Sequence, residues 1–203
     1  SYTSGGAEWI DHEWLFQVLA AALFDSGGAP SLVLLRMAVV AALTLLLLRI
    51  GVSSGLDPPV ALLLASLCVL AARPRFFVRP ELATLVLLPL AMWLFADRRG
   101  RRWWPLPLFL VIAVGANLHG AILVAPVLIS VWFAGEVLDQ LIHRRPDRSA
   151  LVSGATGVAA AFVAPIVNPH GPAIWTVPFT LAELVRQPHI PNPEWLSPGP
   201  ADA

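Results

Sequence analysis

The tetrapeptide at residues 117–120, Asn-Leu-His-Gly, interrupts the longest apolar run of the chain, which covers residues 103–138 and holds one charged residue, Glu136. As one helix, these 36 residues would be roughly 54 Å long at 1.5 Å per residue. The hydrocarbon core of a bilayer is about 30 Å thick. The run is therefore too long for one span, and the polar tetrapeptide near its middle predicts a turn between two helices.

Two interpretations of this turn remain open. Its amide and imidazole groups can simply be the polar end of a helical hairpin. Alternatively, they lie at the membrane face because a ligand needs them, since polar groups in lipid are costly unless they are used. Other polar motifs arriving at the same face would favour the second interpretation.

The composition indicates an integral membrane protein. The 203 residues are 57% hydrophobic and 13% charged, with a mean hydropathy of +0.73, whereas soluble domains carry about 25% charged residues. The formal net charge is zero and no basic face with interleaved aromatic residues occurs, which argues against a nucleic-acid partner. The single cysteine, Cys68, argues against a disulfide framework or a cysteine metal site.

Hydropathy predicts an all-α transmembrane bundle of about six spans with one or two interfacial helices, and we treat residues 1–203 as one partial domain. Residues 1–29 are expected to form an outer loop and an interfacial helix at 14–24, ended by Asp-Ser-Gly-Gly. Residues 168–203 are expected to form an outer loop or tail. Residues 30–167 hold the six expected spans, at 30–50, 58–72, 82–96, 103–116, 121–138 and 150–167.

The arginine distribution predicts the orientation, because cytoplasmic loops carry an excess of positive charge. Alternating spans put eight arginines on one side, mostly in basic loops at 97–102 and 139–149, and four on the other. The richer side is predicted to be cytoplasmic. The unusual polar residues then gather on the extracytoplasmic side, and the candidate site residues among them are Asp11, His12, Glu13, Arg73, Arg75, Arg79, Glu81, Asn117, His119, Asn168, His170 and Glu194.

Three of these candidates, Arg73, Arg75 and Arg79, run against the positive-inside trend. They either pair with acids on the same side or bind an anionic head group, because guanidinium forks suit phosphate oxygens. Lipid phosphates lie at this depth of the membrane. A phospholipid or a lipid-linked phosphate is therefore the natural ligand.

The acidic stretch of Asp11, His12 and Glu13 precedes the expected interfacial helix. Its acids can be ordinary helix-start charges, which the helix dipole favours, or one of them can act as a general base tuned by His12. His12, Glu13, His119 and His170 are also acceptable metal ligands, but their spacing carries no metal signature. We predict no cofactor, with a divalent metal as the open alternative.

Several short motifs follow one another along the chain: Ser1-Tyr2-Thr3, Trp9, 12–15 (His-Glu-Trp-Leu), 79–81 (Arg-Pro-Glu), 117–120, 168–171 (Asn-Pro-His-Gly) with Trp175, and 194–198 (Glu-Trp-Leu-Ser-Pro). In order and spacing they resemble a group of bacterial polytopic membrane proteins that look like the GT-C class of glycosyltransferases. The resemblance implies an enzyme of the bacterial cytoplasmic membrane. Such an enzyme takes a sugar from a polyprenyl-phosphate donor and transfers it at the extracytoplasmic face, with an acid of the first outer loop as base.

The chain departs from that pattern at its start, where relatives carry a further span and an acidic loop ahead of the Ser-Tyr-Thr stretch. We therefore expect a piece of a longer polytopic protein, in which Asp11 and Glu13 are substitutes for a base in the missing part. The alternative is a non-enzymatic transporter component or lipid-phosphate-recognising protein. Transporters commonly place their sites at the bilayer midplane within inverted repeats, and no clear repeat occurs here, which favours the enzyme.

Overall fold

The protein, seen as a computed structural model, is described at residues 11, 13–98 and 103–186, and all structural statements refer to these residues. This part is helical and contains no β-strand. Its α-helices are α1 (Trp14–Ser53), α2 (Pro58–Ala71), α3 (Glu81–Ala96), α4 (Pro105–Leu118), α5 (Val124–Ile142), α6 (Arg148–Val163) and α7 (Val177–Arg186). Short 3-10 helices lie at Arg73–Arg75, Gly120–Leu123, Ala164–Ile166 and Gly171–Thr176.

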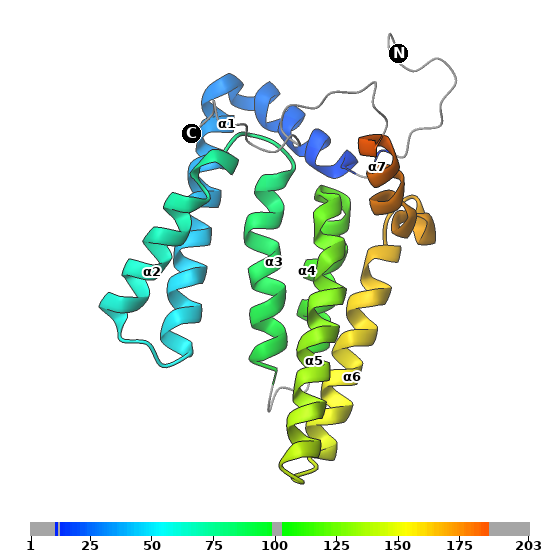
Figure 1. Cartoon of the computed structure of the whole chain (residues 1–203). Coiled ribbons are helices and arrows are strands. Elements are labelled where there is room, and N and C mark those ends of the chain that lie inside the picture. The colour runs from blue at the N-terminus through cyan, green and yellow to red at the C-terminus, as the bar shows by residue number, and fades with distance from the viewer. Residues whose placement is uncertain (1–10, 12, 99–102, 187–203) are drawn as a thin grey trace.

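The first helix is bent where the sequence predicts a break. Gly28 has φ 62° and ψ −154° inside α1, a conformation that glycine adopts without a steric penalty, and Pro30 follows. The hydroxyl oxygen of Ser31 lies 2.5 Å from the carbonyl oxygen of Leu23 and 2.7 Å from that of Gly28. The part before the bend lies across one end of the bundle, and the part after it runs alongside α2 (Figure 1). The expected interfacial helix and first span are therefore one kinked helix.

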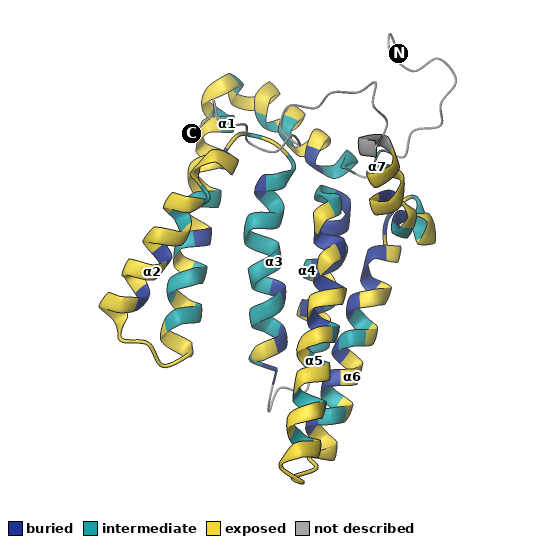
Figure 2. Cartoon of the chain, in the orientation of Figure 1, coloured by how far each residue is buried: buried dark blue, intermediate teal, exposed yellow. Residues whose placement is uncertain are grey.

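Three helical stretches of the described chain are long and apolar enough to cross a membrane, namely Trp14–Ser53, Gly120–Ile142 and Arg148–Ile166. The helices α2, α3 and α4 are apolar but have 14, 16 and 14 residues, fewer than the roughly 20 that a span needs. Large apolar side chains such as Leu45 and Leu70 are exposed, and Figure 2 shows such exposure along α2 and α5. The protein is thus a membrane protein, and its six-span arrangement stays a prediction.

The main core lies where α3, α4, α5 and α6 meet. Phe95, Leu108, Ile112 and Ile129 are fully buried there. Small residues on α6 allow the neighbouring side chains to come close, because a Cβ atom at Gly157 would stand 2.2 Å from Cη2 of Trp104. This packing holds the end of α3 against the start of α4, at the end of the bundle opposite the polar groups of the candidate site.

One residue of the predicted basic loop at 97–102, Arg98, is buried in the structure. Its side chain is 1% exposed, its Nη1 donates to the carbonyl oxygen of Phe95 at 2.8 Å, and its Nη2 is ion-paired with Glu136 of α5. The guanidinium carbon also lies 4.2 Å from the centroid of the Phe95 ring. Because the end of α3 is packed into the core, Arg98, two residues past it, is buried as well, and a buried guanidinium needs a carboxylate partner. Arg98 is therefore a core residue rather than part of a solvated loop.

Candidate functional site

Polar residues from four separate parts of the chain meet at one end of the bundle. These parts are the start of α1, the start of α3, the turn between α4 and α5, and the segment after α6 (Figure 1). Hydrogen bonds and the contact between Glu13 and His119 connect them directly. The structure thus brings together the described polar motifs that the sequence predicts to share one face.

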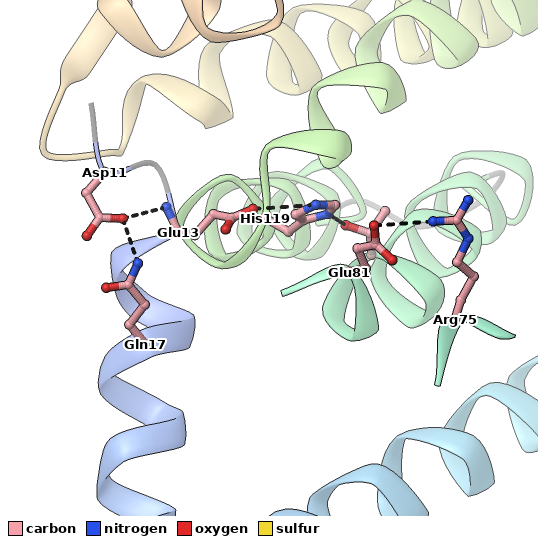
Figure 3. A network of polar contacts seen from close by, with 7 residues as sticks. Asp11, Glu13, Gln17, Arg75, Glu81 and His119 are labelled. Atoms are coloured by element: carbon pink, nitrogen blue, oxygen red, sulfur yellow. Dashed lines mark hydrogen bonds and ion pairs between the residues drawn. The ribbon is translucent and has the colours of Figure 1, made fainter. Parts of the chain in front are cut away.

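His119 lies at the centre of this polar end. Helix α4 ends at Leu118, and His119 has an extended backbone (φ −161°, ψ 130°) before the next 3-10 helix begins, so the predicted turn is confirmed. The ring Nε2 lies 3.5 Å from Oε1 of Glu13, and Nδ1 lies 2.8 Å from Oγ1 of Thr84 on α3. Figure 3 shows the Glu13 carboxylate facing the His119 ring. The side chains of His119 and Glu13 are 17% and 27% exposed, so both remain partly accessible.

Asp11 holds the beginning of α1. Its Oδ1 accepts hydrogen bonds from the backbone N–H of Glu13 at 3.3 Å and from Nε2 of Gln17 at 3.1 Å (Figure 3). Because Asp11 lies two residues before the N-cap Glu13, its carboxylate orders the approach to α1 without capping a helical N–H group. The backbone oxygen of Asp11 lies 3.2 Å from Nε2 of His170, which ties this stretch to the segment after α6.

Asn117 is a buried clamp, with 7% of its surface exposed. Its Oδ1 accepts from Nε1 of Trp14 at 2.8 Å and from Nδ2 of Asn168 at 3.2 Å. Its Nδ2 donates to the carbonyl oxygens of Ala113 and Val167, each at 2.8 Å. The amide group thus joins α1, α4 and the segment after α6, as expected of a buried polar group that is fully hydrogen-bonded.

Asn168 makes a second such link and is 8% exposed. Its Nδ2 donates to the carbonyl oxygen of Ala116 at 3.1 Å, and its Oδ1 accepts from the backbone N–H of His170 at 3.0 Å. The structure therefore gives Asn117 and Asn168 a holding role. Their predicted part in substrate binding stays a prediction.

The arginine loop between α2 and α3 lies at the same end. Nη1 of Arg75 is 3.4 Å from Oε1 of Glu81, and the two side chains are 62% and 34% exposed. The guanidinium carbon of Arg79 lies 5.7 Å from the ring centroid of Phe77. Arg73, Arg75 and Arg79 are all exposed. An exposed pair such as Arg75–Glu81 contributes little stability. The three exposed arginines give this loop positive charge at the surface.

An apolar groove of about 320 Å³ lies between both parts of α1, the start of α3 and the end of α4. All of its lining residues are apolar, and they include Phe16, Val39, Ala83, Val86 and Leu118. Ala83 and Leu118, which line the groove, are the chain neighbours of Thr84 and His119, so the groove and the polar cluster lie on the same helix ends, although no residue of the cluster lines the groove. A ligand with an apolar chain and a polar head could meet both.

The structure adds Thr84, Trp14 and Gln17 to the predicted site residues. The sequence could have indicated Thr84, because it is a polar residue in an otherwise apolar helix, three positions after the Glu81 of the Arg-Pro-Glu motif. His12 and Glu194 lie outside the described residues. Among the residues that are described, no group of three or more His, Cys, Asp or Glu side chains is placed to hold a metal ion.

No protein-family model, no curated protein and no solved structure matches the chain. The resemblance to GT-C glycosyltransferases therefore rests on the short sequence motifs alone.

Proposed function

We propose that the chain belongs to a GT-C-like glycosyltransferase of the bacterial cytoplasmic membrane, which uses a polyprenyl-phosphate-linked sugar as donor at the extracytoplasmic face. One observation carries this proposal. The carboxylate of Glu13 and the imidazole of His119 are partly exposed beside an apolar groove, at the bundle end that also bears the arginine loop.

The chemistry of such a transfer matches these groups. A base takes the proton of the acceptor hydroxyl, whose oxygen forms a bond to the anomeric carbon. The bond between that carbon and the phosphate oxygen breaks, and polyprenyl phosphate leaves with the electron pair. Glu13 suits the role of the base, exposed arginines suit the charge on the departing phosphate, and the groove suits the first part of the polyprenyl chain.

Binding of the lipid phosphate is expected to depend on the arginine loop. In the full-length parent protein, replacing Arg73, Arg75 and Arg79 together by alanine should lower the polyprenyl phosphate retained through purification by about tenfold or more, because charge-assisted hydrogen bonds are lost. Arg79→Lys alone should also weaken retention, since an ammonium lacks the planar fork. The lipid is quantified by mass spectrometry of extracts from equal amounts of protein.

The matched control changes three arginines that are also exposed, at the turn between α5 and α6: Arg144, Arg145 and Arg148. This triple-alanine variant should retain as much lipid phosphate as wild type. Equal retention by both triple variants would remove the arginine loop from the site.

A second candidate function is lipid-phosphate recognition without catalysis, as in a transporter component. The exposed arginines and the groove would serve it equally well. The two functions share the expected lipid binding and differ in turnover. Sugar transfer by the full-length protein therefore separates them.

The orientation has its own test, in a Cys68→Ala background. A cysteine at Ala173, which is exposed at the polar end, should react with an impermeant maleimide added outside intact cells. A cysteine at His143, exposed in the turn at the other end, should react only after permeabilisation. The reverse pattern would place the polar end in the cytoplasm.

A further inference from the structure

Thr84 differs from the other described threonines in the partner of its hydroxyl. Thr44, Thr156 and Thr180 each donate to the carbonyl oxygen four residues earlier, at 2.8, 2.8 and 3.2 Å. That local bond is the usual one for a hydroxyl on a helix. Oγ1 of Thr84 instead lies 2.8 Å from Nδ1 of His119, which belongs to another part of the chain.

Two neighbours of His119, Glu13 and Thr84, indicate which ring nitrogen of His119 carries the proton. The Glu13 carboxylate faces Nε2 at 3.5 Å and favours a proton there. In the neutral ring, Nδ1 then carries the lone pair, so the Thr84 hydroxyl donates to it. A hydroxyl, an imidazole and a carboxylate follow one another in this order, contributed by α3, the α4–α5 turn and the start of α1. The order of hydroxyl, imidazole and carboxylate is that of the triads that activate a nucleophilic hydroxyl, here with the two ring nitrogens exchanged relative to the Ser-His-Asp template.

We propose that Thr84 is a nucleophile for acyl transfer, with His119 as its general base and Glu13 as the residue that positions His119. The substrate class is a long-chain acyl ester. The apolar groove supplies the reason, because Ala83 and Leu118, the chain neighbours of Thr84 and His119, line it, and it can hold an acyl chain while the ester group meets the polar cluster. This activity is separate from sugar transfer, which needs no covalent bond to Thr84.

Each step balances. The oxygen of Thr84 adds to the ester carbonyl carbon while its proton moves to Nδ1 of His119. The tetrahedral intermediate collapses, the bond from carbon to the alcohol oxygen breaks, and the alcohol leaves with that proton. The acyl group is then on Thr84. Water or another hydroxyl attacks the acyl carbon while its proton moves to Nδ1 of His119; the bond from that carbon to the Thr84 oxygen then breaks, and His119 passes this proton to the Thr84 oxygen as the acid or new ester departs.

The test uses a hexadecyl fluorophosphonate, in which a nucleophilic oxygen displaces fluoride from phosphorus. The full-length protein in detergent is expected to form an adduct at Thr84, located by mass spectrometry of its peptides. Thr84→Ser should keep the adduct and Thr84→Val should lose it. Glu13→Gln and His119→Ala should slow its formation by about tenfold or more, because the base is disturbed or removed.

Two controls separate this role from a structural one. Thr156→Val removes an exposed hydroxyl that bonds to its own helix and should leave the labelling rate unchanged. Val86→Trp should slow labelling by the hexadecyl probe but not by an ethyl probe, because it fills the groove. The absence of an adduct at Thr84, or an equal rate in His119→Ala, would overturn the proposal, whatever the result for sugar transfer.

Discussion

Replacement of Glu136 by leucine is expected to lower the free energy of unfolding by about 3–5 kcal/mol, because it leaves a buried charge without its partner. The Arg98 side chain is 1% exposed and would keep its charge in the core. Its Nε is already buried without a hydrogen-bond partner among the described residues, so loss of the Glu136 carboxylate would leave a second part of the guanidinium group without a partner. Reversible unfolding in detergent micelles, followed by circular dichroism, measures the effect.

Helix α5 offers a matched control in its other ion pair. Asp139 and His143 lie 3.1 Å apart, but their side chains are 72% and 61% exposed. Asp139→Asn should therefore cost less than about 1 kcal/mol. The double variant Arg98→Met, Glu136→Leu should recover most of the stability lost in the single variant, since no unpaired charge remains. A cost for Glu136→Leu as small as that for Asp139→Asn would contradict the burial of the pair.

The helices of this fold follow from composition more readily than their contacts do. The expected span at 82–96 and the helix Glu81–Ala96 agree to one residue, and the span at 58–72 ends one residue after Pro58–Ala71. Long apolar runs broken by polar or proline-containing turns form helices wherever the backbone must satisfy its own hydrogen bonds. The helix end predicted at 25–28 for the same reason is instead a bend at Gly28 within one helix.

The pairing of Arg98 with Glu136 could not be read from the sequence. The two residues are 38 positions apart; Arg98 follows the end of the apolar helix α3, and Glu136 lies in the largely apolar helix α5. Such helices show no stripe that tells which face points inward. Which charged residue is buried, and against which partner, then depends on how the helices are rotated in the bundle. For the same reason the sequence predicts Arg98 to lie in a basic loop and does not indicate its burial.

The candidate site was predictable in its location and not in its contacts. Alternation of spans places the turns that carry Asn117 and Asn168 at one end, and the structure has them there. The alternation of spans does not indicate that the side chain of Asn117 accepts a hydrogen bond from Trp14, 103 residues away, or that the side chain of His119 contacts Thr84. These contacts depend on side-chain directions at helix ends, which hydropathy does not encode.

The largest expected effect on activity comes from Glu13. Glu13→Gln should reduce sugar transfer by about 10²–10⁴-fold, the usual contribution of a general base, while leaving retention of the carrier lipid unchanged. Asp11→Asn should have a smaller effect, because Oδ1 of Asp11 serves as an acceptor for Gln17 and for a backbone N–H, and an amide oxygen can accept both bonds. Transfer is measured in membranes that express the full-length parent, at matched protein levels.

Two histidine variants provide the scale for this result. His119→Ala removes the group that faces Glu13 and should fall between wild type and Glu13→Gln. His170→Ala loses a contact to the Asp11 backbone and should lie closer to wild type. Full activity in both Glu13→Gln and Asp11→Asn would place the base outside the described residues. The polar end of this bundle would then hold the lipid phosphate for a base supplied elsewhere, because its arginine loop and apolar groove do not depend on either acid.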